Sequence, residues 1–163
     1  MQPSSLNVFD QPRHRCNACT ANVCNLNPGS LGHVRITSIR PLDAARLQAN
    51  HLSTLENRQV AADSPQLTRR IAAMPALARC RPREVKPGTR FQTDDELARL
   101  ADDIGTAIFH PVDNCRMGAE SEAAAVVDSR LRVRGVAGLR IVDASVMPTI
   151  TSGNTNSPTL MIA

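Results

Sequence analysis

Aromatic side chains are nearly absent from this chain of 163 residues, which contains no tryptophan, no tyrosine and three phenylalanines. Its core must therefore be built from leucine, isoleucine, valine, alanine and methionine. Such a core is thin and would gain from burial against another surface. Hydrophobic residues still make up 42% of the sequence, which is enough for a globular domain and excludes a disordered tail.

Long apolar runs are also missing from the sequence. No window approaches the roughly 20 apolar residues that a membrane-spanning helix needs. The N-terminus lacks the short apolar core of a secretory signal. The expected location is therefore cytoplasmic, without a membrane span.

Lysine is represented by Lys86 alone, and the other basic residues are arginines, which leave a formal net charge of +4. The arginines are scattered along the chain, and no aromatic platform accompanies them. This pattern favours a solvated surface over nucleic-acid binding.

The five cysteines are an odd number, which fits a reducing compartment better than a disulfide scaffold. Cys16 and Cys19 form a C-x-x-C pair with Cys24 and His14 nearby, and such a set can bind zinc or act as a redox pair. No second C-x-x-C follows, and no strand and helix are expected around the pair. Free thiols are therefore favoured, and no metal site is predicted.

Residues 1–20 show no hydrophobic periodicity, which is typical of a flexible lead-in. A turn sequence, Asn-Pro-Gly-Ser, follows at residues 27–30. Residues 32–38 alternate polar and apolar side chains, which predicts a half-buried strand with His33 on its polar face. His51, just ahead of a helix, is also expected to face solvent.

Two capping boxes predict helices. Ser53–Glu56 opens the first, where Pro65 predicts a break or kink, with a second helix continuing towards Leu77. Thr93–Glu96 opens another helix, which is expected to deliver His110 from its C-terminal end. The apolar residues of this helix recur at helical spacing: Leu97, Leu100, Ala101, Ile104 and Ile108.

The C-terminal part changes to short β-type runs. Leu139–Ser145 predicts a buried strand that ends near Asp143. A polar loop follows, and Ser157 is expected to cap a helix whose first position is Pro158. That helix reaches Ala163 after about one turn without the usual stop signals, so a truncated chain is expected.

Several groups near this end of the chain suit chemistry. Asp143 suits the hydroxyl groups of a ribose or ribityl chain, and Asn154 can donate and accept beside a reacting oxygen. The N-terminus of the last helix suits an anion or an electron-rich carbonyl. His110 alone would be weak support for catalysis, because a histidine after a helix often satisfies carbonyl groups. The presence of Asp143, Asn154 and the helix start in the same part of the chain strengthens the case that His110 is catalytic.

Residues 110–118, HPVDNCRMG, and residues 126–163 together resemble the C-terminal signature of the glucose-methanol-choline (GMC) oxidoreductases. The resemblance is closest to the choline dehydrogenase and alcohol dehydrogenase branch. Residues 23–54 resemble the start of the same region, so the match runs from Ala21 to Ala163. It implies an FAD-dependent enzyme that oxidises a small-molecule alcohol at its CH–OH group.

The resemblance also implies residue roles. His110 matches the family's catalytic base, which takes the hydroxyl proton as the hydride moves to flavin N5. Asn154 matches the position that orients the substrate oxygen. Cys115 is expected to pack behind the histidine. The resemblance implies five FAD contacts: Asp143, Ala144, Asn156, Ser157 and Pro158. The last three lie at the start of a helix, whose dipole favours negative charge on the flavin.

Three features depart from the family pattern. Pro65 falls where the family normally continues a helix. Asp113 and Asn114 stand where the family usually has Gly-Thr, and glycine permits backbone conformations that aspartate adopts less easily. No G-x-G-x-x-G opening a βαβ unit occurs in the sequence, although this loop holds the FAD pyrophosphate in the family.

The predicted fold is α+β. Residues 21–109 are expected to form a GMC-type substrate-binding domain, an antiparallel or mixed sheet with helices on one face. Residues 110–163 are expected to supply the catalytic segment and the C-terminal strand and helix start of an FAD domain whose Rossmann core is absent.

The predicted function is that of a C-terminal fragment of an FAD-dependent alcohol dehydrogenase, inactive in isolation. One alternative is a subunit that a separate FAD-binding half completes, and another is a non-catalytic remnant. A nucleic-acid or zinc-binding module, built on the arginines and the N-terminal cysteines, is the third alternative.

Overall fold

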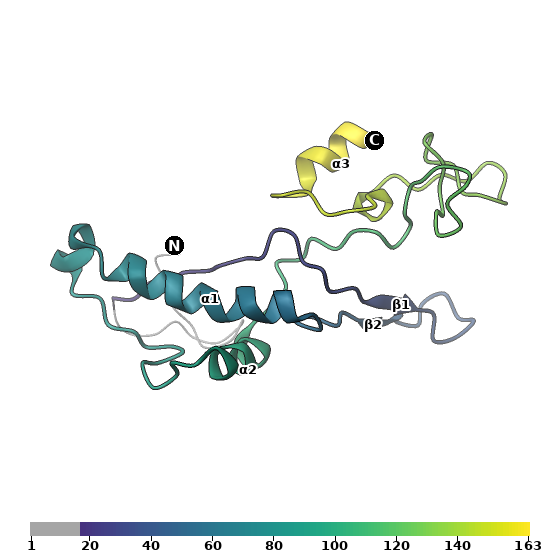
Figure 1. Cartoon of the computed structure of the whole chain (residues 1–163). Helices are drawn as coiled ribbons and strands as arrows, with labels where there is room; N and C mark the ends of the chain where they lie inside the picture. The colour runs from purple at the N-terminus through teal and green to yellow at the C-terminus, as the bar shows by residue number, and fades with distance from the viewer. Residues whose placement is uncertain (1–16) are drawn as a thin grey trace. The chain divides into compact units, whose positions relative to one another are not determined.

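A computed structural model of the chain describes residues 17–163. The described residues combine a pair of antiparallel strands with helices, which agrees with the predicted α+β class. In chain order the elements are β1 (His33–Arg35), β2 (Arg46–Gln48), α1 (Leu55–Ala72), the 3₁₀ helix η1 (Pro75–Cys80), α2 (Asp94–Ile104), the 3₁₀ turn η2 (Ala144–Val146) and α3 (Asn156–Ile162) (Figure 1).

The chain divides into two compact units. The described part of unit 1 comprises residues 17–25 and 59–101, and unit 2 comprises residues 26–58 and 102–163. The predicted domain limits, 1–20, 21–109 and 110–163, stay predictions. Within residues 17–163, no helix is long and apolar enough to cross a membrane.

The strands β1 and β2 pair antiparallel, with Val34 opposite Leu47. A strand was predicted within residues 32–38, and β1 confirms it. The predicted half-burial is wrong, because Val34 is 47% exposed and Ile36 is 89% exposed. A two-stranded ribbon has no second layer to cover either of its faces. His33 and His51 are exposed, as predicted.

The first turn of α1 is joined to the turn at residues 27–30. The buried side chain of Asn57 accepts a hydrogen bond from the Gly29 N–H (3.1 Å) and donates one to Ser30 Oγ (2.6 Å). The predicted cap at Ser53 is displaced by one residue, because the Asn57 N–H donates to Thr54 Oγ1 instead (3.2 Å). The N–H of Ser53 donates to Ser30 Oγ, which holds Ser53 outside the helix.

The prediction at Pro65 was a break or a kink; the break is wrong, since α1 continues through it as a single helix, and the kink stays a prediction. A proline in a helix removes one backbone hydrogen bond and crowds the preceding turn. Two hydroxyl groups bind backbone carbonyls in the surrounding turns, where Ser64 Oγ donates to Val60 O (2.7 Å) and Thr68 Oγ1 donates to Ser64 O (2.9 Å). Neither bond reaches Ala61 O, so the loss at Pro65 is confined to one backbone hydrogen bond of the helix. The predicted second helix towards Leu77 is replaced by η1, beyond the end of α1.

The predicted capping box of α2 is confirmed. The Glu96 N–H donates to Thr93 Oγ1 (3.3 Å), and the Thr93 N–H donates to Glu96 Oε2 (3.1 Å). These bonds lower the pKa of Glu96, chiefly through the backbone bond from Thr93. Leu97 is fully buried, but the helix ends at Ile104. Residues 105–109 therefore separate α2 from His110, and Ile108 lies outside the helix.

An ion pair fixes the loop after η1 in unit 1. Arg69 donates to both carboxylate oxygens of Glu84, at 2.9 and 3.0 Å, and the Gly88 N–H donates to Glu84 Oε1 at 3.1 Å. The hydrogen bond from Arg69 is the main cause that lowers the pKa of Glu84. The loop is thus held to the last turns of α1.

The C-terminal part of unit 2 closes on a small apolar core. Its buried members are Val127, Leu131 and Val146, and around them pack Met117, Val133, Ile141 and Ile162. The strand predicted at residues 139–145 is wrong, because only an isolated bridge joins Arg132 to Arg140 there. Asp143 instead accepts a hydrogen bond from the Ser145 N–H (2.8 Å), which turns the chain into η2.

Removal of the α2 cap should destabilise unit 1. We expect Thr93→Ala to lower the free energy of unfolding by about 1 kcal/mol, because one backbone donor of the first turn loses its acceptor. Urea unfolding followed by circular dichroism measures this loss. Thr89→Ala removes an exposed hydroxyl from the same loop and should have no such effect; equal losses in the two variants would contradict the capping role.

The ion pair between Arg69 and Glu84 should make stability depend on pH. We expect Glu84→Gln to cost about 1 to 2 kcal/mol at pH 7, where the carboxylate is ionised and accepts charged hydrogen bonds. Because the folded-state pKa of Glu84 is lowered, the wild-type advantage is present above the ordinary glutamate value, about 4.3, and is lost below it.

Urea unfolding of both proteins across that pH range tests this expectation. Glu120→Gln, at an exposed glutamate, is the matched control. A Glu84→Gln deficit that stays constant from neutral to acidic pH would show that the ion pair is not its cause.

Candidate functional site

His110 lies against two consecutive residues of the loop that leads into α3. Its Nδ1 is 3.0 Å from Thr155 Oγ1, and its Nε2 is 3.4 Å from Asn154 Nδ2. The structure therefore brings together the two residues predicted to be catalytic, His110 and Asn154, from positions 44 residues apart. It adds Thr155, which sequence reasoning missed.

The segment that follows His110 is held to residues 143–146 by backbone hydrogen bonds. The Cys115 N–H donates to Ser145 O (3.0 Å), and the Met117 N–H donates to Val146 O (2.9 Å). Val146 is fully buried in the apolar core. The thiol of Cys115 is half-buried, and its expected place behind the histidine stays a prediction.

The loop residues are held by α3. Thr155 is the residue that precedes the helix, and its carbonyl accepts hydrogen bonds from the N–H and the hydroxyl of Thr159, at 3.0 and 2.7 Å. Ile162, at the end of α3, packs against the apolar core. The predicted cap at Ser157 is therefore wrong, and Pro158 occupies the third helical position rather than the first.

The side-chain amide of Asn154 has a defined orientation. Its Oδ1 accepts a hydrogen bond from the Asn156 N–H at 2.9 Å, which leaves Nδ2 on the side of His110. An amide nitrogen only donates, so Asn154 offers a hydrogen-bond donor where the imidazole Nε2 lies.

The backbone next to His110 adopts unusual conformations. Phe109 has φ of 60° and Asp113 has φ of 75°, both in the left-handed region that favours glycine. This is the conformation expected to be unfavourable for aspartate at the family's glycine position. The Asp113 carboxylate accepts two hydrogen bonds from Arg116, at 2.7 and 3.1 Å, and so raises the pKa of that arginine.

The predicted cofactor contacts lie on exposed or half-buried surface of the same unit. Asp143 is exposed, and it uses its Oδ1 for the bond to Ser145. Ala144 is half-buried in η2. The other predicted contacts are the first three residues of α3, Asn156, Ser157 and Pro158. Pro158 has no backbone N–H.

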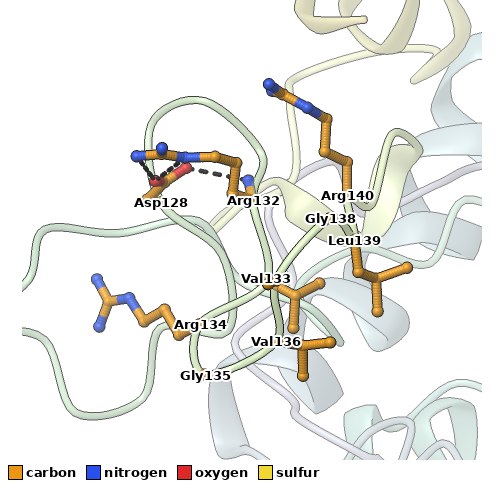
Figure 2. A pocket seen from close by; sticks show the side chains of 10 residues that line it. Asp128, Arg132, Val133, Arg134, Gly135, Val136, Gly138, Leu139 and Arg140 are labelled. Carbon is orange, nitrogen blue, oxygen red and sulfur yellow. Dashed lines mark hydrogen bonds and ion pairs between the residues drawn. The ribbon is translucent and has the colours of Figure 1, made fainter.

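A cavity of about 690 Å³ is formed by residues 128 and 132–140 (Figure 2). Asp128 accepts hydrogen bonds there from the side chain and backbone of Arg132 and from the Arg130 N–H, which lower its pKa to about 2. The carboxylate is thus committed to holding the loop, and neither His110 nor Asn154 lines the cavity.

Metal ligands do not gather among residues 17–163, where no cluster of three or more histidine, cysteine or acidic side chains occurs. Cys19 and Cys24 are exposed. The C-x-x-C pair considered from the sequence includes Cys16, which lies outside the described residues, as does His14.

Comparison with known proteins gives a consistent result. Residues 28–163 match a family model described as GMC oxidoreductase. The chain is 44% identical over 136 residues to the oxygen-dependent choline dehydrogenase of Vibrio vulnificus, and the aligned region covers 83% of this chain and 24% of that protein. It is 39% identical over 144 residues to the alcohol dehydrogenase (acceptor) of Pseudomonas putida, with 88% and 26% covered.

A solved structure gives a similar picture. The FAD-dependent oxidoreductase from Chaetomium thermophilum matches 84% of this chain and 24% of its own, with a TM-score of 0.76 at 27% identity. The chain thus spans about a quarter of the length of the relatives it matches.

The strain at Asp113 is testable with two substitutions that both remove the ion pair to Arg116. We expect Asp113→Gly to be more stable than Asp113→Ala by about 1 kcal/mol, because glycine adopts a positive φ without steric cost. Urea unfolding measures the difference. At Asn114, where φ is not positive, the order should reverse, and an Asp113→Gly variant less stable than Asp113→Ala would contradict the strain.

Proposed function

Because the chain belongs to the GMC oxidoreductase family, we propose that it carries the base and the orienting amide of an FAD-dependent oxidation of a small-molecule alcohol. The resemblance of residues 110–118 and 126–163 to this family is thereby confirmed. The observation that supports the proposal is the pairing of His110 Nε2 with Asn154 Nδ2 across 3.4 Å.

In this proposal His110 moves the proton. An alcohol hydroxyl that enters between the two side chains donates its hydrogen to His110 Nε2 and accepts a hydrogen bond from Asn154 Nδ2. The O–H bond breaks as the N–H bond forms, and the emerging alkoxide stays hydrogen-bonded to Asn154. FAD, when bound, accepts the hydride that leaves the neighbouring carbon.

The described residues fit the edge of such a cofactor. Asp143 is exposed, and its hydrogen bond with the Ser145 N–H uses Oδ1. Its Oδ2 can therefore accept a hydrogen bond from a ligand hydroxyl. At the start of α3 the Asn156 N–H is used by Asn154 and Pro158 has none, which leaves the Ser157 N–H for a carbonyl oxygen. Ala144 and Pro158 supply half-buried surface beside these groups.

The pyrophosphate of FAD calls for residues beyond these 163, since the sequence has no G-x-G-x-x-G loop. We propose that an FAD-binding part, equivalent to the remaining length of the relatives, completes the site. Exposed apolar side chains support this idea, because they offer surface for a partner, as in Ile36, Ile39, Leu42, Leu160 and Met161.

The second candidate function is a non-catalytic remnant, in which the fold survives without turnover. The strained replacement at Asp113 favours it, because the family pattern has glycine there. The joined arrangement of His110, Asn154 and Thr155 favours the catalytic proposal. Titration of the chain with FAD, alone and with the N-terminal three quarters of the Vibrio vulnificus enzyme, separates the two.

Turnover should depend on His110. We expect a chimera in which residues 28–163 replace the matching part of the Vibrio vulnificus choline dehydrogenase to bind FAD and to reduce a dye with choline or simple alcohols. His110→Ala should lower kcat/KM by about 10²- to 10⁴-fold, because the base is removed. The flavin absorbance should stay unchanged, which would show that FAD is still bound.

His51→Ala removes an exposed histidine elsewhere in the same unit and is the matched control, with unchanged turnover. Full activity in the His110→Ala chimera would assign the base to another group. A chimera that binds no FAD, together with no binding by the complemented chain, would favour the remnant.

A further inference from the structure

We propose that Thr155 is a positioning residue that holds His110 in the tautomer with its proton on Nδ1. The observation is the 3.0 Å contact between Thr155 Oγ1 and His110 Nδ1, formed by a threonine that is 6% exposed. The catalytic meaning of this contact rests on the proposed function, whereas the tautomer itself is a property of the chain alone.

The hydrogen-bond pattern around the ring selects one tautomer. Asn154 Oδ1 accepts from the Asn156 N–H, so the group that faces His110 is the donor Nδ2. Its partner Nε2 must then accept, which requires that Nε2 carry no hydrogen in the neutral ring. The ring proton is consequently on Nδ1, where it donates to the Thr155 hydroxyl oxygen.

Thr155 is available for this bond because its side chain does not cap α3. A threonine in the capping position of a helix ordinarily accepts from the backbone N–H of the second or third helical residue. Here the third residue is Pro158, which has no N–H, and the Thr155 side chain makes no capping hydrogen bond to the second residue, Ser157, either. Its hydroxyl oxygen is thus left to accept from the imidazole.

Thr155 is also held in place. Its carbonyl accepts from the N–H and hydroxyl of Thr159, and α3 is anchored to the apolar core by Ile162. A β-branched side chain has few rotamers, so the hydroxyl position follows from the backbone. The imidazole therefore presents the Nε2 lone pair towards Asn154, where the proposed function needs the base.

The tautomer is measurable by nitrogen NMR of the histidine rings in the 163-residue chain, without FAD. The signals of His110 are assigned from their loss in His110→Ala. In the neutral ring of the wild type, we expect Nδ1 to show a protonated, pyrrole-type shift and Nε2 an unprotonated, pyridine-type shift. The opposite pattern would overturn the proposal.

Three variants test the part that Thr155 plays. Thr155→Val removes the acceptor with little change in volume, and we expect the ratio of the two tautomers to move about fivefold towards Nε2–H, the effect of one ordinary hydrogen bond. Thr155→Ser keeps the hydroxyl and should keep the wild-type ratio. Thr151→Val is the matched control, since Thr151 Oγ1 is buried without a hydrogen-bond partner among residues 17–163.

An unchanged ratio in Thr155→Val would overturn the proposal. If that variant does not fold, the wild-type shifts and Thr155→Ser still decide it. In an active chimera, Thr155→Val should lower kcat with little effect on KM, and Thr155→Ser should restore it. The two proposals can fail separately. If the wild type shows the Nδ1–H tautomer and this tautomer depends on Thr155, but every chimera is inactive, the proposed function is refuted and the positioning role of Thr155 stands.

Discussion

The backbone hydrogen bonds from Cys115 to Ser145 and from Met117 to Val146 are the constraint on which the candidate site depends. They join the segment that carries His110 to the segment that leads into α3. Val146 is a buried member of the apolar core, and Ile162 packs α3 against the same core. One small apolar cluster thus supports an arrangement in which the Asn154 amide and the Thr155 hydroxyl each lie within hydrogen-bonding distance of the imidazole.

This arrangement is maintained although parts of the backbone are strained. Left-handed conformations at Phe109 and Asp113 are unfavourable for side chains other than glycine, and they persist where the surrounding contacts hold them. The pair of Asp113 with Arg116 is one such contact, and Arg116 also donates to Pro148 O at 3.4 Å. The Asp113 carboxylate, which stands where the family usually has glycine, therefore helps to hold this backbone conformation through Arg116.

Sequence reasoning succeeded where the interactions are local and failed where they are not. The reciprocal bonds of Thr93 and Glu96 lie within one turn, and α2 begins where the capping box predicts. The break considered at Pro65 is absent, because α1 loses there only the one backbone hydrogen bond that a proline cannot donate and continues as a single helix. The strand predicted near Asp143 was misjudged because an aspartate side chain, bonded to Ser145, bends the chain into η2.

The sequence by itself determined the family, the motif around His110 and the residue types that chemistry needs, because these depend on the order of side chains along the chain. Only the tertiary structure decided which groups meet. Thr155 lies within hydrogen-bonding distance of His110 across 45 positions, and its side chain makes no capping hydrogen bond within α3. Thr155 carries no local signal for this role, since the contact exists only after the apolar core has closed around Val146.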